Sequence, residues 1–533
     1  MSRPRTLTAL AVALLGAAAL SPIASAADIA ESKGFRKAVT VAGIREHQAA
    51  FQAISDANGG NRVAGSVAYD ASVDYVVGRM EAAGYDVSLF PFDFLYNADA
   101  TPPVFTQVSP TAASYVDGVD FSSMTFSPNG DVTTQLYAVN LAIPPGAPNS
   151  SPGGCTAAQY AGFPVGAIAL VQRSTCTFAV KAQLAAAAGA SAVIVMNEGQ
   201  AGRTGAVAGT LGGPATHTIP VIGTTFAIGA DLANGIANGL TGSIARVRVD
   251  RDFETRTTHN IIAETPGGDP NRVVVAGAHL DSVTRGPGIN DNGSGSAALV
   301  EIAEVYAAQD RTPRNKLRFM WFGAEEFGLL GSRAYVASLS AAEIADIELM
   351  LNFDMIGSPN YIRGVYDGDG SATLPAGPAG SAFVEDVFVD YFNSQTLASE
   401  PTQFSGRSDY GPFIAAGIPA GGLFTGAEAG KTQAQANLYG GIVGASLDPC
   451  YHLACDTYAG TGSGAGATAP GLGLKALDEM SDAVAHAILF FSRTKVDVSA
   501  TAASTALRSA YALDGTVVDA GPHPDDDHET VDR

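Results

Sequence analysis

Basic residues are scarce in this chain. Of its 533 residues, 30 are lysine or arginine and 52 are aspartate or glutamate, so the formal net charge is −22. A surface with this charge repels phosphate backbones, and nucleic acid is therefore excluded as an expected partner. The acidity favours solubility and says little about the substrate.

Long apolar runs are missing beyond the N-terminus. Arg3 and Arg5 precede a short apolar stretch from Leu7 to Leu20, and Ala24-Ser25-Ala26 supplies the small residues of a cleavage site. The stretch is shorter than the roughly 20 residues that a membrane-spanning helix needs. We therefore predict a signal peptide at residues 1–26 and a secreted, extracellular protein without stable membrane insertion.

Cysteine is also rare, with four residues in two close pairs, Cys155 with Cys176 and Cys450 with Cys455. In an exported protein, disulfides are the expected use of such pairs. One structural zinc site built from all four is the alternative, but neither pair has the two-residue gap of a zinc knuckle. We predict that each pair closes one loop.

The length of the chain favours two domains. Strands and helices alternate from residue 258 to about 495, which predicts an α/β fold with a mainly parallel, mixed sheet and helices on both faces. Between residues 112 and 250, charges are few and short β-like runs are frequent, as in an inserted β-rich domain. The predicted division is a signal peptide (1–26), one domain from residues 27–111 and 251–497, an inserted domain (112–250), and an acidic, disordered tail (498–533).

Histidine and acidic side chains follow several of the predicted strands. His279 ends one apolar strand, Glu325 and Glu326 follow a second, and Asp354 follows a third. Ligands bind at the carboxyl ends of parallel strands, so these side chains can converge. Two further candidates lie in loops: Asp291, where a glycine-rich loop opens a helix, and His452, between Cys450 and Cys455.

Imidazole nitrogen and carboxylate oxygen are ligands that zinc accepts. Two histidines and three carboxylates suffice for two zinc ions if one carboxylate bridges them. Taken singly, each residue has an ordinary reading as a loop, turn or solvated side chain. Their recurrence at successive strand ends favours one shared metal site.

These segments resemble the secreted di-zinc aminopeptidases related to bacterial leucine aminopeptidases and to aminopeptidase Y, over about residues 40–110 and 255–495. The likeness is carried by Ala278-His279-Leu280-Asp281-Ser282, Asp291-Asn292-Gly293-Ser294-Gly295 and Ala324-Glu325-Glu326-Phe327-Gly328. The resemblance implies two Zn²⁺ per chain. By this resemblance His279 and Asp354 bind zinc, Asp291 bridges both ions, and Glu326 and His452 complete the shell of the second ion. It also implies that Glu325 is the general base and that Asp281 orients the ring of His279. Tyr451 would stabilise the oxyanion, and Arg407 would contact the substrate.

The insertion resembles a protease-associated domain in the runs Gly166–Val171 and Ile219–Gly223. The likeness leaves open whether this domain covers the active site, restricts substrate length or binds a partner. The preferred side chain of the substrate depends on pocket walls that no motif reveals.

The predicted activity is hydrolysis of the N-terminal peptide bond of peptides or proteins, with zinc-activated water and Glu325 as the base, by an enzyme expected to be a monomer. A metallocarboxypeptidase is the first alternative; it needs a cation for the substrate carboxylate, and Arg407 is the visible candidate. A single-zinc acyltransferase similar to glutaminyl cyclase is the second. A non-catalytic binding module on a peptidase scaffold is the third, although such a module typically lacks a ligand or the base and none is missing here.

Overall fold

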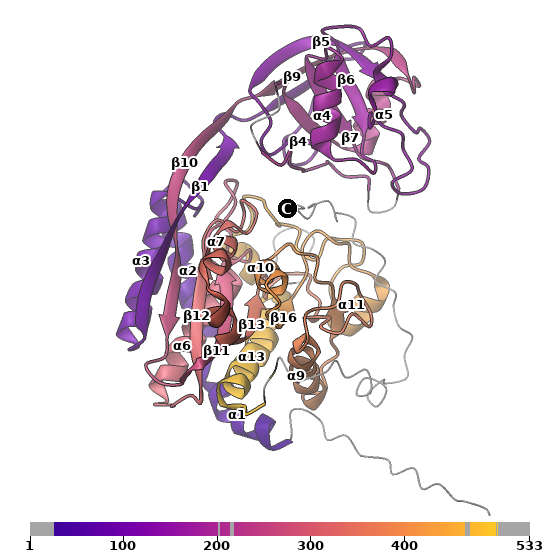
Figure 1. Cartoon of the computed structure of the whole chain (residues 1–533). Helices are drawn as coiled ribbons and strands as arrows, with labels where there is room; N and C mark the ends of the chain where they lie inside the picture. Colours follow the sequence, from indigo (N-terminus) through magenta and orange to yellow (C-terminus); the bar gives the residue numbers. More distant parts are fainter. Residues whose placement is uncertain (1–25, 201–202, 214–217, 464–469, 497, 499–533) are drawn as a thin grey trace, which may run out of the picture.

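The computed structural model describes residues 26–496 and Val498, apart from residues 201–202, 214–217 and 464–469 (Figure 1). The predicted signal peptide, except Ala26, and the predicted acidic tail, except Val498, lie outside the described residues. Within the described part of the chain, no helix combines the length and the apolar character needed to cross a bilayer.

The larger half of the molecule is built on an eight-stranded mixed sheet. Its four central strands are parallel to one another, whereas β10 and β14 run antiparallel to the central strands that they flank. This confirms the predicted mainly parallel sheet. In spatial order the strands are β1 (Asp86–Asp99), β10 (Arg251–Glu264), β12 (Asn315–Phe322), β11 (Asp269–His279), β13 (Ile347–Phe353), β16 (Ala420–Phe424), β14 (Gly364–Tyr366) and β15 (Glu400–Thr402).

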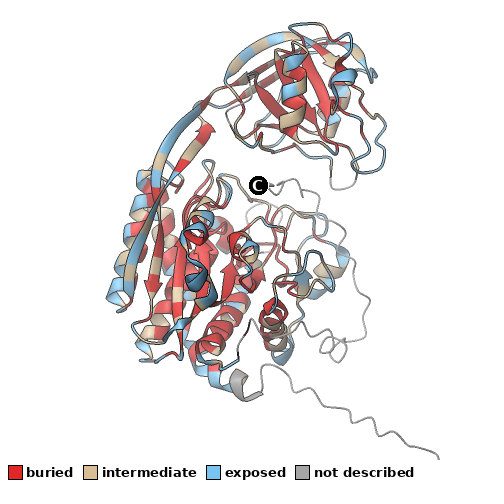
Figure 2. Cartoon of the chain, in the orientation of Figure 1, coloured by how far each residue is buried: buried red, intermediate tan, exposed pale blue. Residues whose placement is uncertain are grey.

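Helices cover both faces of this sheet, as Figures 1 and 2 show. Along β11, Val274 and Ala276 pack into one core while Val273 and Val275 pack into the other. Strands buried on both faces are apolar throughout, which explains why these strands are recognisable in the sequence. The first core is covered by α1 (Ala26–Ala38), α2 (Val41–Ala57), α3 (Val67–Ala82), α6 (Gly293–Ala308), α9 (Ser381–Ser394) and α13 (Leu472–Arg493), and the second by α7 (Leu330–Ser338), α8 (Ala341–Asp346) and α10 (Tyr410–Ala415).

Polar caps fix where several of these helices begin. The side chain of Ser66 accepts a hydrogen bond from the backbone N–H of Tyr69, so α3 starts at Val67. The apolar periodicity alone predicts a later start, at Ala71. Asn292 caps α6 in the same way by accepting from Gly295, and this places the loop before α6 at a defined position.

The inserted part contains a second eight-stranded sheet, in which four neighbouring strands are parallel and three of these four are fully buried. Helix α4 (Phe178–Ala187) packs on one face and α5 (Phe226–Ala233) on the other. Because β2 pairs with β9 in this sheet, the inserted segment begins before residue 112, where the change in sequence texture places it. The strand order is β3 (Ala113–Ser114), β2 (Val104–Ser109), β9 (Gly239–Val249), β5 (Gly130–Ala138), β6 (Ile168–Gln172), β7 (Ala192–Met196), β8 (Val221–Thr224) and β4 (Phe121–Ser123).

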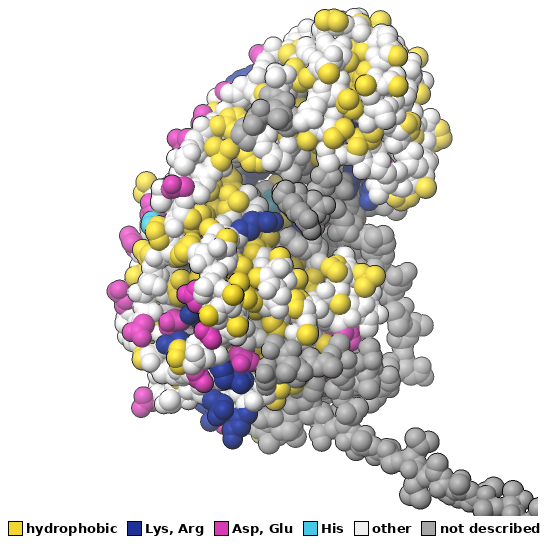
Figure 3. Space-filling view, in the orientation of Figure 1, with side chains coloured by type: hydrophobic (Ala, Val, Ile, Leu, Met, Phe, Trp, Pro, Cys, Tyr) yellow, Lys and Arg dark blue, Asp and Glu magenta, His cyan; other side chains and the backbone are white. Residues whose placement is uncertain are grey.

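A long two-stranded ribbon joins the two halves. β1 and β10 pair antiparallel from Asp86 opposite Glu264 to Asp99 opposite Arg251, and Figure 1 shows the ribbon extending from the first sheet toward the second. Both strands extend beyond the runs of apolar alternation that mark them in the sequence, since the outer end of β10 is largely exposed and that of β1 includes the buried polar Asn97. Figure 3 shows apolar side chains spread over this face of the inserted part, with acidic ones mainly on the larger half.

The predicted disulfides are both present. Cys155 and Cys176 are joined in the inserted part, and Cys450 and Cys455 are joined in the larger half. No free cysteine remains. The alternative of one zinc site built from all four cysteines is therefore wrong.

His47 on α2 is a buried histidine that makes stability depend on pH. Its Nδ1 lies 2.7 Å from the Tyr75 hydroxyl, and its Nε2 lies 3.7 Å from Glu304 and 3.9 Å from Glu301. Burial lowers the pKa of His47 to about 4. An unfolded histidine titrates near 6.5, so the unfolded state takes up the proton first as the pH falls.

The free energy of unfolding that the neutral His47 contributes at pH 7 is therefore lost as the pH falls from about 6.5 toward 4. The expected loss between pH 7 and pH 5 is about 2 kcal/mol. We expect His47→Gln to show a shallower loss of unfolding free energy over this interval than the wild type. Urea unfolding of both proteins at pH 7 and pH 5 measures the difference. Equal losses in the two proteins would show that His47 does not carry this dependence.

Candidate active site

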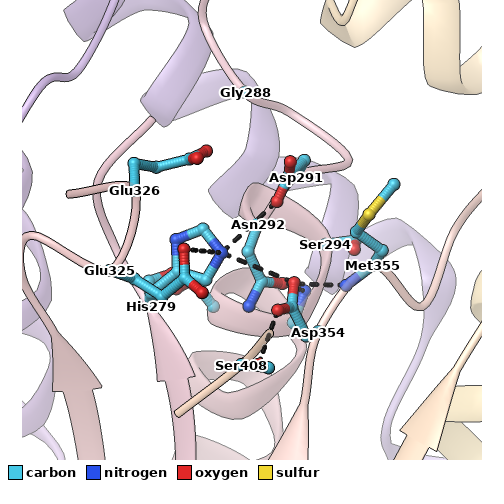
Figure 4. Close-up of polar contacts among 12 residues, drawn as sticks. His279, Gly288, Asp291, Asn292, Ser294, Glu325, Glu326, Asp354, Met355 and Ser408 are labelled. Carbon is cyan, nitrogen blue, oxygen red and sulfur yellow. Dashed lines mark hydrogen bonds and ion pairs between the residues drawn. The ribbon is translucent and has the colours of Figure 1, made fainter. Parts of the chain in front are cut away.

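The predicted site residues meet at the carboxyl edge of the central strands. His279 is the last residue of β11, Asp354 directly follows β13, and Glu325 and Glu326 follow β12 after a two-residue turn. Figure 4 shows their side chains directed toward one another and toward Asp291, in the loop before α6. The sheet therefore brings together groups that are far apart in the sequence.

One group of potential ligands surrounds His279. Its Nε2 lies 3.3 Å from Oδ1 of Asp291 and 3.4 Å from Oδ1 of Asp354. Glu325 is slightly more distant, with its Oε2 3.8 Å from the same nitrogen. One imidazole and two carboxylates are thus close enough to bind a single cation.

A second group surrounds His452. Its Nε2 lies 3.2 Å from Oδ2 of Asp291 and 3.1 Å from Oε2 of Glu326. The two oxygens of Asp291 therefore face different histidines, Oδ1 toward His279 and Oδ2 toward His452. Asp291 belongs to both groups and has the position of a bridging carboxylate.

The backbone is unusual at three points of this site. Ala324, Met355 and His452 have φ angles of 53°, 51° and 57°, in the left-handed region that residues with a Cβ seldom occupy. Ala324 precedes Glu325, and Met355 follows Asp354. Such strain persists where the surrounding structure enforces it, and it is common at functional sites.

Asp281 contacts both the ring of His279 and the backbone of the two glutamates. Its carboxylate accepts hydrogen bonds from the backbone N–H groups of Glu325 and Glu326, at 3.1 and 3.3 Å. The ring Nδ1 of His279 lies 3.2 Å from the backbone oxygen of Asp281 and 3.6 Å from its carboxylate. The carboxylate thus positions the two glutamates, and the carbonyl is the closer partner of the histidine ring.

Three supporting residues were not predicted. The hydroxyl of Ser408 donates a hydrogen bond to Oδ2 of Asp354 at 2.6 Å. The carboxylate of Asp456 accepts from the backbone N–H groups of Asn290 and Asp291, at 2.7 and 3.0 Å. In the sequence, Ser408 and Asp456 are next to Arg407 and Cys455, which are among the predicted residues. This adjacency is the one feature of the sequence that points to them.

The third is Arg62, whose side chain is fully buried. Its guanidinium donates hydrogen bonds to the backbone oxygens of Leu280, Pro287 and Gly288. It therefore ties together the ends of the loop between His279 and Asp291. A single arginine in a polar turn gives no sign of this role in the sequence.

Tyr451 and Arg407 lie together beside the second group. The ring of Tyr451 stacks on that of His452, with centroids 3.8 Å apart. Arg407 donates a hydrogen bond to the Tyr451 hydroxyl oxygen at 2.9 Å and another to Oε1 of Glu428 at 2.6 Å. Glu428 was not predicted, because nothing local in the sequence connects it with Arg407.

The inserted part contacts the rim of the site. Asp117 forms an ion pair with Arg285 at 2.9 Å, and Arg285 belongs to the loop between His279 and Asp291. The neighbouring Gly118 has a φ of 79°, and a Cβ built on it would lie 2.7 Å from Arg285 and 3.9 Å from Leu453. Leu453 follows His452 within the Cys450–Cys455 loop, so this turn of the inserted part is paired with the loop between His279 and Asp291 and lies near the loop that carries His452.

The electrostatics of the site favour cations. Oδ1 of Asp354 and Oε1 of Glu326 are buried and have no hydrogen-bond partner among the described residues. Burial raises the pKa of Glu325 and Glu326 above the usual range. Burial disfavours the charged form of His452, but Glu326 and Asp291 outweigh this and raise its pKa to about 10.

Buried carboxylates beside imidazole nitrogens, two of them with one oxygen that lacks a hydrogen-bond partner, make a donor set that fits zinc. The candidate ligands are divided between two groups, His279 with Asp291 and Asp354, and Asp291 with Glu326 and His452. A third, overlapping group joins His279 with Glu325 and Glu326. A mixed α/β sheet with these donors at its carboxyl edge has the design of a metal-dependent hydrolase.

Comparison with known proteins places the chain within this class. The sequence profile of peptidase family M28 matches residues 260–469, and that of the PA domain matches residues 132–232. An aminopeptidase of Pseudomonas aeruginosa is 46% identical over 405 residues, which cover 76% of this chain and 74% of the relative. A probable leucine aminopeptidase 2 of Aspergillus fumigatus is 45% identical over 401 residues, covering 74% of each chain. The protein belongs to peptidase family M28 and is an aminopeptidase with an inserted PA domain.

Solved structures share the architecture. An aminopeptidase from Aneurinibacillus sp. strain AM-1 superimposes with a TM-score of 0.65 at 28% identity, covering 87% of this chain and 97% of that one. A zinc aminopeptidase from Bacillus subtilis superimposes with a TM-score of 0.59 at 24% identity, covering 86% and 97%. The latter similarity concerns the fold alone.

Proposed function

We propose that this protein is a secreted aminopeptidase that binds two zinc ions and hydrolyses the N-terminal peptide bond of peptides and proteins. The proposal rests on Asp291, whose two carboxylate oxygens face two different histidines. Each histidine has one further carboxylate of its own, Asp354 beside His279 and Glu326 beside His452. The proposed ligands are therefore His279, Asp291, Glu326, Asp354 and His452.

Bound zinc would polarise the scissile carbonyl and make water a stronger nucleophile near neutral pH. The proposed role of Glu325 is to accept the proton from the attacking water and to return it to the leaving amine. Its backbone is fixed by Asp281, and its side chain is buried at the edge of both groups. These features suit a base that must stay in place.

Tyr451 is the proposed donor to the oxyanion. Its oxygen accepts a hydrogen bond from Arg407, so its own hydrogen is available to another acceptor. Stacking on His452 holds the phenol beside the proposed second metal position. A prepositioned donor of this kind stabilises charge that develops during the reaction.

The contacts of Arg407 weigh against a carboxypeptidase. Such an enzyme needs a cation for the substrate's terminal carboxylate, and the guanidinium of Arg407 already forms an ion pair with Glu428. A single-zinc acyltransferase would need one ligand group, whereas the two groups here share Asp291 and otherwise use different residues. Neither alternative accounts for the arrangement as well as a two-metal aminopeptidase does.

The test combines zinc quantification with substrate blocking. We expect about two zinc ions per chain from the two ligand groups. We also expect leucine p-nitroanilide to be cleaved and its N-acetylated form to react about 100-fold more slowly or worse, because blocking the amine leaves site carboxylates unpaired. Equal cleavage of the free and acetylated substrates would exclude an aminopeptidase, and one zinc per chain would favour the acyltransferase.

Secretion, the boundaries of the parts and the monomeric state belong to the same proposal. The two disulfides support an oxidising, extracellular location. The two sheets with separate cores support one domain from residues 27–111 and 251–497 and an inserted domain near residues 112–250, with the earlier start that β2 indicates.

A further inference from the structure

Arg407 and Glu428 form an ion pair at the edge of the proposed active site. The guanidinium Nη1 lies 2.6 Å from Oε1 of Glu428, and both side chains are partly buried. A close pair of this kind offsets the charge of the arginine and fixes the direction of its other donors. Glu428 therefore determines what Arg407 offers to a substrate.

The second donor of Arg407 is also directed by this pairing. Nη2 lies 2.9 Å from the hydroxyl oxygen of Tyr451, whose ring stacks on His452. Glu428, Arg407 and Tyr451 thus form a continuous chain of hydrogen bonds that ends beside the second ligand group. The chain of hydrogen bonds positions Tyr451 and at the same time neutralises Arg407.

We propose that Glu428 is a specificity-determining residue: by neutralising Arg407 and holding it on Tyr451, it prevents the site from favouring substrates with a C-terminal carboxylate next to the scissile bond. The proposal rests on the proposed function, with the scissile carbonyl oxygen near the Tyr451 hydroxyl. It predicts an enzyme that treats the first bond of a long peptide and the bond of a dipeptide alike.

The geometry of a dipeptide makes this discrimination possible. Its terminal carboxylate is attached one Cα beyond the scissile nitrogen, within about 5 Å of the scissile carbonyl oxygen. Arg407 lies one hydrogen bond away from the Tyr451 oxygen. With Glu428 uncharged, the guanidinium there could reach a dipeptide's carboxylate, whereas a dipeptide amide or a longer peptide offers no charge at that position.

The test compares leucyl-glycine with leucyl-glycinamide. We expect the wild type to cleave both with similar kcat/KM. Glu428→Gln removes the charge and keeps the shape, and it should raise the ratio of kcat/KM for the acid to that for the amide by about tenfold, the effect of one gained charge-assisted hydrogen bond. The gain should appear mainly in KM, since the carboxylate does not react.

A matched control is available at the opposite end of the sheet. Glu264 forms an ion pair with Arg318, and Arg318 donates a hydrogen bond to the Tyr335 hydroxyl, as Arg407 does to Tyr451. The side chains of Glu264 and Arg318 are 24% and 20% exposed, close to the 24% and 25% of Glu428 and Arg407. Glu264→Gln should leave the acid-to-amide ratio at the wild-type value. The double variant Arg407→Met/Glu428→Gln should return the ratio to that value too.

Glu428→Ala removes the same charge and should shift the ratio in the same direction, so the test does not depend on the folding of one variant. Thermal unfolding of each variant checks that the fold is kept. If the wild type cleaves neither substrate, the proposed function fails. If the wild type is active but both Glu428 variants keep its ratio, the specificity role of Glu428 is refuted.

Discussion

Replacing Glu325 by glutamine is expected to lower kcat by about 10³-fold, within the range that a positioned general base contributes, while zinc stays bound. Glutamine keeps the size of the side chain but cannot accept the proton. Glu325 belongs to neither of the two ligand groups that share Asp291, but its carboxylate lies 3.8 Å from His279, which belongs to the first group. The loss should therefore fall on turnover and leave zinc content and KM nearly unchanged.

The measurement pairs steady-state kinetics with zinc analysis of the same preparation. Glu326→Gln is the matched comparison, since it alters the adjacent glutamate, whose Oε2 lies 3.1 Å from His452. That variant should lose zinc as well as activity. A Glu325→Gln enzyme with near-wild-type turnover would remove Glu325 from the role of base.

Replacing Asp291 by alanine is expected to have an equally large effect for a different reason. Both of its oxygens face histidines of the two groups, so its removal takes one donor from each. We expect zinc content to fall below one ion per chain and activity to fall to background. Metal analysis after gel filtration and activity measured over a range of added zinc would show the loss.

Asp291→Asn separates charge from shape at this position. Asparagine retains one oxygen, so this variant should bind zinc more weakly than the wild type and regain part of its activity at high zinc. The backbone N–H of residue 291 still reaches Asp456, and the loop should keep its place. An Asp291→Ala protein with two firmly bound zinc ions would contradict the bridging role.

Much of the larger half could be predicted from the sequence, because its central strands are buried on both faces. The run Phe319–Phe322 is apolar at every position, and this is what marks β12 before the acids that follow it. The outer ends of β1 and β10 could not be found in this way, since they pair with each other without a run of apolar residues: residues 252–255 of β10 are exposed, and β1 buries the polar Asn97. The early start of α3 depended on one capping hydroxyl, that of Ser66.

The candidate ligands could also be predicted, because each follows a recognisable strand or lies in a distinctive loop. The residues that hydrogen-bond to these ligands and to Arg407 could not be predicted. Ser408 reaches Asp354 across 54 residues, and Glu428 reaches Arg407 across 21 residues that include α10 and β16. Hydrogen bonds of this kind depend on how loops at the end of the sheet face one another, and that arrangement is a property of the folded chain.

The turn at Asp117 and Gly118 bears on any attempt to shorten this enzyme. Asp117 forms an ion pair with Arg285, so excising the inserted part would leave this arginine without its acidic partner beside the loop of Asp291. A trimmed peptidase would therefore need a substitute for this ion pair, such as an acidic residue grafted opposite Arg285, before the loops that carry Asp291 and His452 could be compared with those of the parent.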